Sequence, residues 1–297
     1  MFICLTFSLL FAGRNSCIAC TAFCICKGDR IFLCKNLDYE KVDGLLCYSP
    51  PGEVHEGRVN GLSWVSKYGS ISFCYENPCC PLGGMNEKGL CIEELSCQPF
   101  FSVSDSSRTS IDEFGWVRYH LDRCASVGEV IASQDTLSLV PGKFYLHYII
   151  TDATGKVAVI RFEAGRAVIF AGDSLPYPVL SNNTYESSLR YLASFQGFGG
   201  DLPANESLAS CDRFVRIARC LADGEASGTV DERSCFAILD EVRQEDTQWQ
   251  LVYDIPERKV YFIADGSPVR HVIDLQGFMH SGDGKPRAIS LEKLYGS

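Results

Sequence analysis

Short hydrophobic runs separated by turn residues dominate the first hundred residues of the chain. Residues 21–26 and 30–35 flank Lys27-Gly28-Asp29, a polar stretch with the glycine that a tight hairpin turn needs. Two further runs, 70–75 and 90–95, have the same strand-like character. The glycine-rich residues 83–89 are interpreted as the turn that leads into the second of these runs. The pattern therefore predicts antiparallel strands here.

Helical periodicity begins after residue 110. Ser110 with Glu113 forms a capping-box pattern, and apolar residues recur at helical spacing from Ile111 to Leu121. A second capping box, Ser126 with Glu129, predicts another helix. Beyond these, the pattern predicts strands at 144–151, 157–163 and 166–171, helices at 185–195, 211–222 and 232–242, and a hairpin joining 250–254 to 259–263.

The order of these elements indicates the fold class. Strands, helices, strands, helices and strands follow one another, which is not the strict β-α alternation of a parallel sheet. The order favours an α+β protein in which helices pack outside antiparallel sheets. No internal repeat, low-complexity tract or long polar linker divides the chain, so residues 20–297 are predicted to form one domain.

Composition and charge narrow the class of partner. Of the 297 residues, 46% are hydrophobic and 22% charged, as in ordinary globular proteins. The net charge of −10 argues against nucleic acid, whose phosphates require a Lys/Arg-rich surface, and gives no reason to expect an anionic membrane as partner. A small-molecule or peptide substrate is the remaining expectation.

The first 19 residues are predicted to be a signal peptide. Residues 1–12 are apolar but shorter than the roughly 20 residues that span a membrane, so no stable membrane insertion is expected once they are removed. Small residues at Cys17 and Ala19 suit a signal-peptidase site, and cleavage there would expose Cys20 in an exported protein, periplasmic or secreted. No Lys or Arg precedes the apolar run, however. A buried first strand, a mis-chosen start codon or a cytoplasmic propeptide therefore stay open.

Sixteen cysteines leave three interpretations open. They form disulfides in an exported protein, act as small hydrophobic residues, or bind metal. Cys17/Cys20 has the C-x2-C spacing of a zinc knuckle, but no second knuckle follows, because Cys24/Cys26 lie inside a strand-like run and Cys79-Cys80 are adjacent. The five histidines have no metal-site spacing, and the chain lacks a G-x-S-x-G serine elbow. No metal is predicted.

Two motifs carry a family resemblance. Residues 20–23, Cys-Thr-Ala-Phe, followed after a hairpin by residues 35–39, Lys-Asn-Leu-Asp-Tyr, resemble the choloylglycine hydrolase and penicillin V acylase family of linear amide hydrolases. The resemblance continues through residues 64–70, 84–90, 179–182, 213–214 and 249–254. It implies a four-layer αββα fold, an N-terminal nucleophile, no metal or organic cofactor, a small-molecule amide substrate and assembly as a homotetramer.

A cysteine at the N-terminus suits amide hydrolysis chemically. An amide is a poor electrophile, so the enzyme must supply a nucleophile, a base and an oxyanion site. The α-amine of Cys20, once free, has a pKa near 8 and can take the proton of the thiol, whose ordinary pKa is near 8.5. An internal cysteine has an amide nitrogen there, which is no base. Removal of residues 1–19 is therefore expected to be part of activation.

The resemblance also implies roles for other residues. Asp38 matches the aspartate that holds the terminal amine and thiol, and Asn182 the asparagine that donates to the oxyanion. Arg213 matches an arginine near the nucleophile, expected to favour the thiolate and to pair with Asp38. From the residues alone, other roles stay open: Asp38 can be a turn aspartate, Asn182 a loop cap and Arg213 a solvated helix arginine.

Two positions depart from the family pattern. Lys35 stands where many relatives have arginine, so it keeps the charge but loses the planar fork that grips a carboxylate. Ser96 stands where bile-salt hydrolases have an asparagine beside the oxyanion hole, although its backbone N–H can still donate. Both departures put bile salts in doubt as substrates.

Three other functions stay open from the sequence. One is an acyltransferase or acid-ceramidase-like amidase with the same nucleophile. Another is an exported binding protein without catalysis, suggested by Lys35 and Ser96. The last is a lipoprotein acylated at Cys20, although Cys17 occupies a position where a lipobox prefers leucine.

Overall fold

A computed structural model gives the fold of the chain. It describes residues 19–295 apart from 40, 42, 60, 100–106, 141, 204, 226–229, 265, 266, 268 and 281–283. Residues 1–18, most of the predicted signal peptide, lie outside the described residues.

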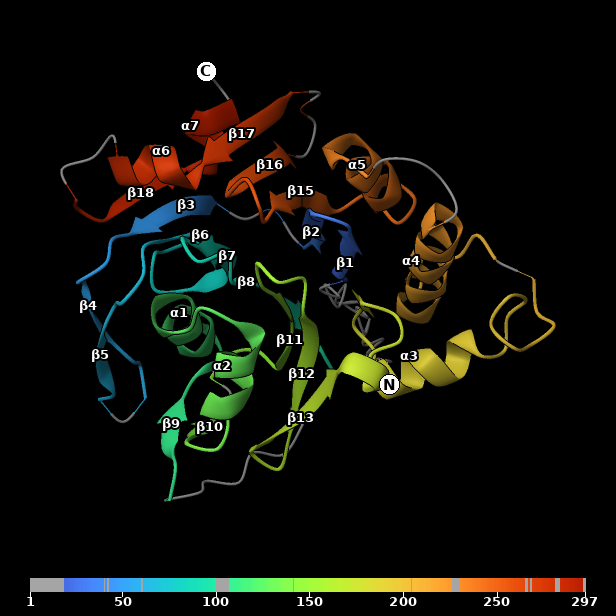
Figure 1. The fold of residues 1–297 in the computed structure, drawn as a ribbon, viewed down its shortest axis with the longest axis horizontal. Helices are drawn as coiled ribbons and strands as arrows, with labels where there is room; N and C mark the ends of the chain where they lie inside the picture. The colour runs from blue at the N-terminus through green and yellow to red at the C-terminus, as the bar shows by residue number, and fades with distance from the viewer. Residues whose placement is uncertain are drawn as a thin grey trace, which may run out of the picture.

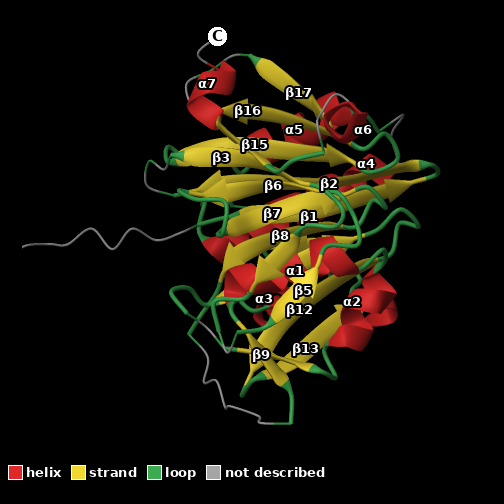
Figure 2. Cartoon of the chain, turned by 90° about the vertical axis from the view of Figure 1, so that its left-hand side faces the viewer, coloured by secondary structure: helices red, strands yellow, loops and turns green. Residues whose placement is uncertain are grey.

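Two large antiparallel sheets stack face to face in the middle of the molecule (Figure 2). The first has six strands in the order β14-β1-β2-β15-β16-β17, and the second has eight in the order β13-β12-β11-β8-β7-β6-β3-β18. The strands of the first sheet are β1 (Thr21–Lys27), β2 (Arg30–Asp38), β14 (Val179–Leu180), β15 (Thr247–Asp254), β16 (Lys259–Ala264) and β17 (Arg270–Asp274). Those of the second are β3 (Gly44–Ser49), β6 (Ser70–Tyr75), β7 (Pro81–Asn86), β8 (Cys91–Ser96), β11 (Leu146–Thr151), β12 (Val157–Glu163), β13 (Arg166–Ala171) and β18 (Arg287–Ser290).

Helices cover the outer face of each sheet, which gives the four layers of an αββα sandwich (Figure 1). On the first sheet lie α3 (Tyr185–Leu192), α4 (Ser210–Glu225) and α5 (Glu232–Asp240), and on the second α1 (Glu113–Arg123) and α2 (Val127–Ser133). The remaining elements are β4 (Val54–Glu56), β5 (Ser63–Val65), β9 (Thr109–Ile111), β10 (Leu137–Leu139), the 3-10 helix η1 (Gly172–Ser174), α6 (Leu275–His280) and α7 (Leu291–Tyr295). The predicted α+β class and αββα layering are confirmed.

The core between the sheets is apolar and aromatic. Phe73 of the second sheet packs edge-to-face against Tyr253 and Phe262 of the first, and all three are almost fully buried. Burial of such rings supplies most of the free energy that holds two sheets together. Among the described residues, none of the helices combines the length and apolar character needed to cross a membrane.

Two local predictions are wrong. Residues 83–89 were expected to be a turn, but Pro81–Asn86 form strand β7, and only the residues after Asn86 turn. Position 84 within this strand is a glycine because a side chain there would collide with the Ile71 backbone of β6. Ser110 was expected to cap α1, but it belongs to β9, and Asp112 caps the helix by accepting from the Gly115 N–H.

The side chain of Asn86 holds the turn between β7 and β8. Its side-chain nitrogen donates to the carbonyls of Leu121 and Cys124 at the end of α1, at 2.8 and 2.7 Å. Its side-chain oxygen accepts from the N–H groups of Lys88 and Leu90. Since a buried amide is stable only when its polar atoms are bonded, Asn86 fixes the β7–β8 turn against α1.

Candidate active site

Cys20 immediately precedes β1 and lies directly opposite Leu37 of β2. The ladder pairs Thr21 with Asn36, and the Ala19 N–H donates to the Asp38 carbonyl at 3.1 Å, so Cys20 and Leu37 are cross-strand neighbours. Opposite residues of an antiparallel pair project to the same face, and alternate residues to opposite faces. Cys20 therefore faces the second sheet together with Leu37 and Lys35, and no part of it is exposed. Thr21 faces the helices.

Asp38 is held beside the peptide bond that joins Ala19 to Cys20. One carboxylate oxygen accepts from the Thr247 hydroxyl at 2.5 Å, and the other from the Gln244 amide at 2.6 Å. The same Gln244 nitrogen donates to the Ala19 carbonyl at 2.9 Å. Burial raises the pKa of Asp38 to about 6, although the hydrogen bonds from Thr247 and Gln244 oppose that rise. Asp38 thus lies near the nitrogen of Cys20, which becomes a free amine once the bond to Ala19 is cleaved.

Arg213 of α4 contacts the same segment from the helical layer. Its guanidinium donates to the Thr21 hydroxyl at 2.8 Å, to the Cys20 carbonyl at 3.2 Å and to the Asn182 side-chain oxygen at 2.7 Å. We expected this arginine to pair with Asp38: its positive charge lowers the pKa of that carboxyl, whose two oxygens accept hydrogen bonds from Thr247 and Gln244. Fixed in this way, Arg213 orients Asn182 and the first residues of β1.

Asn182, in the loop after β14, bridges the two sheets. Its side-chain nitrogen donates to the Ser96 carbonyl at 2.9 Å, while its oxygen accepts from Arg213. A primary amide has two N–H groups, so one remains beyond the bond to Ser96. The Cys97 N–H donates to the Tyr145 carbonyl on one side of the strand. Because the N–H groups of successive residues in a strand point to opposite sides, the N–H of Ser96 points away from Tyr145. It is thus on the side where the Ser96 carbonyl accepts from Asn182. The Asn182 side-chain nitrogen and the Ser96 N–H therefore lie on the same side of this strand.

Lys35 lies in a buried cluster of charges. Its ammonium is 2.9 Å from a Glu93 oxygen and 3.1 Å from a Glu94 oxygen, and it also donates to the Glu94 carbonyl at 2.7 Å. The hydroxyl of Tyr253 donates to the other oxygen of Glu93. Sequence reasoning did not find this cluster, although adjacent glutamates in an otherwise buried strand require a cation nearby. It also did not find Gln244 and Thr247, which belong to no motif.

The thiol of Cys20 is not an anion while Ala19 is attached. Burial raises its pKa to about 12, and the negative charges of Glu94 and Asp38 act in the same direction. The positive charge of the Lys35 ammonium lowers this pKa and so opposes them. We had expected Arg213 to have this effect as well. Because burial outweighs the Lys35 charge, a nearby base is needed before this sulfur can attack a carbonyl.

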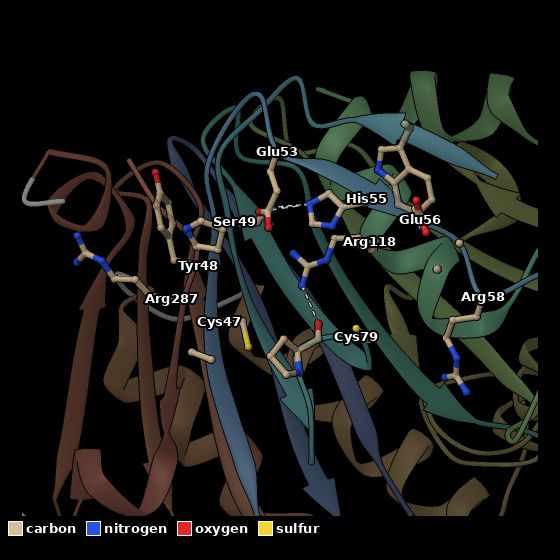
Figure 3. A pocket seen from close by; sticks show the side chains of 16 residues that line it. Cys47, Tyr48, Ser49, Glu53, His55, Glu56, Arg58, Cys79, Arg118 and Arg287 are labelled. Atoms are coloured by element: carbon tan, nitrogen blue, oxygen red, sulfur yellow. Dashed lines mark hydrogen bonds and ion pairs between the residues drawn. The ribbon is translucent and has the colours of Figure 1, made fainter. Parts of the chain in front are cut away.

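A separate cavity, of about 930 Å³ with its open mouth, lies near β3 and α1 and contains Ser49 and His55 (Figure 3). The Ser49 oxygen is 3.0 Å from His55 Nε2, but its hydrogen is directed to Glu53 at 2.7 Å. The nearest carboxylates, Glu53 and Asp122, approach that same ring nitrogen. A catalytic triad needs the two ring nitrogens to have different partners, so this arrangement is not one.

The described cysteines are all free thiols. Most are buried, in keeping with small hydrophobic side chains. Within the described part of the chain, no three His, Cys, Asp or Glu residues come together in a way that would hold a metal ion. Cys17, one of the cysteines considered for metal binding, lies outside the described residues.

Comparison with known proteins decides the family. The model of the family described as linear amide C–N hydrolases, choloylglycine hydrolase family, matches residues 20–262. The chain belongs to this family. The matched region of this choloylglycine hydrolase family member begins at Cys20. No curated protein sequence matches the chain significantly.

Solved structures of similar proteins have the same fold. The chain superposes on penicillin V acylase from Agrobacterium tumefaciens with a TM-score of 0.78 at 23% identity, covering 91% of each chain. For a mutant of conjugated bile acid hydrolase from Clostridium perfringens the TM-score is 0.77 at 18% identity, covering 91% of this chain and 96% of the other. At these identities the likeness shows the fold.

Replacing Lys35 by methionine is expected to cost about 3–5 kcal/mol of stability. The change leaves the Glu93 and Glu94 carboxylates buried without their cation. Chemical denaturation of the variant measures this loss. The control is Lys41→Met, since the Lys41 side chain is 84% exposed and lies 4.0 Å from Glu292, so it should change stability by less than about 0.5 kcal/mol. Equal effects of the two substitutions would contradict the role of the cluster.

The stability of the chain with Ala19 attached is expected to depend on Asp38 and pH. The pKa of Asp38 is raised from 3.8 to about 6, so the unfolded chain loses this proton first as the pH rises. The stability that Asp38 contributes is therefore complete below its unfolded pKa of 3.8 and is lost as the pH rises to about 6. Denaturant unfolding of the wild type and Asp38→Asn across this range measures the difference. A difference that grows in favour of the wild type with rising pH would refute the assignment.

Proposed function

We propose that the protein is an N-terminal nucleophile amidohydrolase in which Cys20, freed by removal of residues 1–19, attacks a linear amide. The observation that carries the proposal is the convergence of Asp38, Asn182 and Arg213 on the segment around Cys20, at the residue where the family match begins. Asp38 would accept hydrogen bonds from the released amine, which takes the place of the Ala19–Cys20 peptide bond.

The reaction would proceed through a thioester. The α-amine accepts the thiol proton, and the sulfur of Cys20 bonds to the amide carbon, which becomes tetrahedral. The free N–H of Asn182 and the backbone N–H of Ser96 donate to the oxygen that becomes negative. The α-ammonium then returns its proton to the departing nitrogen as the C–N bond breaks. Water, deprotonated by the same amine, hydrolyses the thioester to a carboxylic acid.

Lys35 and Arg213 have positioning roles in this proposal. Arg213 fixes Asn182 through its side-chain oxygen, which directs the amide nitrogen toward Ser96 and the oxyanion. Lys35 holds Glu93 and Glu94 at the base of the site, and its charge lowers the pKa of the Cys20 thiol against the effect of burial.

Trapping the acyl-enzyme tests the proposal. The mature protein is incubated with a phenylacetyl amide, quenched in acid and mapped by mass spectrometry. The acyl group is expected on Cys20, and phenylacetic acid is expected as the product. A competing amine separates hydrolysis from acyl transfer, because an acyltransferase or acid-ceramidase-like enzyme would form a new amide instead. An unmodified Cys20 during turnover would reject the mechanism, and no turnover with any amide would favour a binding protein.

We also propose that the protein is exported and assembles as a homotetramer. Both proposals come from the apolar first residues and the family resemblance. Light scattering of the purified mature chain, of 278 residues when counted from Cys20 to Ser297, gives the assembly state. Fractionation of the producing cells gives the compartment, and the mass of residue 20 tells a lipid-bearing cysteine from a free one.

A further inference from the structure

The ammonium of Lys35 has no hydrogen left for a substrate. A lysine ammonium has three N–H donors. In this structure three acceptors surround it: a Glu93 oxygen at 2.9 Å, a Glu94 oxygen at 3.1 Å and the Glu94 carbonyl at 2.7 Å. Lys35 is 1% exposed, so it cannot turn toward solvent without breaking these bonds. It is therefore not available to grip a carboxylate of a bound molecule.

Glu94 has one carboxylate oxygen that Lys35 does not bond. Its Oε1 is bonded to Lys35, whereas its Oε2 has no hydrogen-bond partner among the described residues and is not sealed from the surface. Glu94 is also the one charged residue in the lining of a shallow cleft that is open to solvent and holds about 20 Å³ of space for water-sized molecules. The other lining residues are Leu37, Tyr39, Tyr75, Leu82, Phe114, Phe144 and Leu146.

The cleft is adjacent to the nucleophile. Leu37, in its lining, is the cross-strand neighbour of Cys20 and projects to the same face of the sheet. Glu94, on the second sheet, connects the cleft to the surroundings of Cys20. It lines the cleft and contacts Lys35, which projects to the same face of the first sheet as Cys20. An amide whose carbonyl reaches Cys20 would therefore place an attached apolar group across the open mouth of this cleft, against its lining.

The wall of the cleft is aromatic, and Lys143 lies against it. Tyr39, Tyr75, Phe144 and Phe114 follow one another in edge-to-face contacts with centroid separations of 5.8, 6.2 and 5.8 Å. The ammonium of the exposed Lys143 lies 5.0 Å from the ring centroids of Tyr75 and of Phe144, so a cation of the chain already occupies these ring faces, and a substrate ammonium would bind at Glu94. Because Lys143 is exposed, solvent and salt screen its own charge.

From this geometry we infer that Glu94 selects amides whose ring-sized apolar group carries an ammonium, and discriminates against those carrying a carboxylate there. The ammonium donates to the free Oε2 of Glu94, and the apolar remainder packs on the aromatic wall. A carboxylate in the same place would face Glu94 without a donor from Lys35. This inference rests on the proposed function for the amide chemistry, whereas the recognition of charge rests on the cleft alone.

Two matched substrate series test the inference. In one, the acyl group is 4-(aminomethyl)phenylacetyl, 4-ethylphenylacetyl or 4-(carboxymethyl)phenylacetyl, and in the other the same rings are on the amine. For at least one series, kcat/KM is expected to be about tenfold or more higher for the ammonium than for the carboxylate, as a charge-assisted hydrogen bond provides. In Glu94→Gln this ratio should fall to within about threefold. No ammonium preference in either series would overturn the inference.

Glu93→Gln is the matched control. It removes a carboxylate from the same lysine, but Glu93 is not in the lining of the cleft, so the ammonium preference should persist. If Glu93→Gln removes the preference as fully as Glu94→Gln, the effect comes from the charge of the whole cluster, and the role of the Glu94 oxygen is refuted.

A binding measurement separates this inference from the proposed function. Cys20→Ala protein is titrated with 4-methylbenzylammonium and with 4-methylbenzoate, and the two dissociation constants are compared. The ammonium is expected to bind about tenfold or more tightly. If the enzyme cleaves no amide but this difference is present and disappears in Glu94→Gln, the proposed function fails and the inference stands. Equal binding, or tighter binding of the benzoate, overturns the inference whatever the catalytic result.

Discussion

Cys20→Ala is expected to abolish amide hydrolysis while leaving the fold intact. The substitution removes the sulfur that attacks the carbonyl in the proposed mechanism, so the thioester cannot form at residue 20. It also leaves the ladder around it unchanged, because the hydrogen bonds at this position are made by the backbone and by Asp38, Gln244 and Arg213. Product formation from a phenylacetyl amide, followed by chromatography, measures the loss.

Cys26→Ala is the matched control for that experiment. Cys26 is on the same strand, six residues further along, but its side chain is exposed and lies by Gly155 at the far end of the hairpin. Its replacement should leave turnover within about twofold of the wild type, as surface substitutions usually do. Turnover near the wild-type rate in Cys20→Ala would remove the thioester mechanism from consideration.

Asn182→Ala is expected to lower kcat by about 100- to 1,000-fold. Loss of one oxyanion donor typically raises the barrier by about 2.7–4 kcal/mol, and because the donor acts on the transition state, KM should change little. The substitution also removes the bonds to Arg213 and Ser96, so its thermal unfolding is measured alongside. Steady-state kinetics with a chromogenic amide provide kcat and KM separately.

The adjacent residue supplies the comparison. Asn183 is partly buried like Asn182, but the described contact of Asn183 is made by its backbone N–H to the Ser210 hydroxyl. Asn183→Ala should therefore keep kcat within about threefold of the wild type. A kcat for Asn182→Ala that matches this control would mean that the side chain does not stabilise the oxyanion.

The first hairpin shows how far local pattern determines structure. The turn around Gly28 and the two short hydrophobic runs predicted strands that the structure has at Thr21–Lys27 and Arg30–Asp38. Gly28 has a φ of 62°, a backbone conformation that glycine adopts without strain. Local sequence was sufficient here because the turn, the strands and their register are all determined within about twenty residues.

Strand β7 shows where local pattern fails. Gly83 and Gly84 are typical turn residues by composition, yet they are glycines because neighbouring strands leave no room for a side chain. Glu93 lies over Gly83, and the Ile71 backbone lies against Gly84. A close approach between strands depends on residues far apart in the sequence, so glycine composition alone wrongly predicted a turn.

The charged cluster and the Asp38 contacts were beyond sequence reasoning for a similar reason. Lys35 meets Glu93 and Glu94 across the two sheets, a pairing that requires the packing of the sandwich to be known. Thr247 reaches Asp38 at an irregularity in the β2–β15 ladder, between Thr247 and Trp249. Such a bulge breaks the alternation that marks a strand, which is why that strand was predicted to start only at residue 250.

The central claim is that the active protein begins at Cys20 with a free amine. Intact-mass measurement and N-terminal sequencing of the purified protein, made on the same sample whose amide hydrolysis is assayed, test it most directly. The account predicts that hydrolysis tracks the fraction of chains starting at Cys20 and that chains retaining Ala19 are inactive. Full activity in a sample whose chains all retain Ala19, or carry a blocked residue 20, would contradict it.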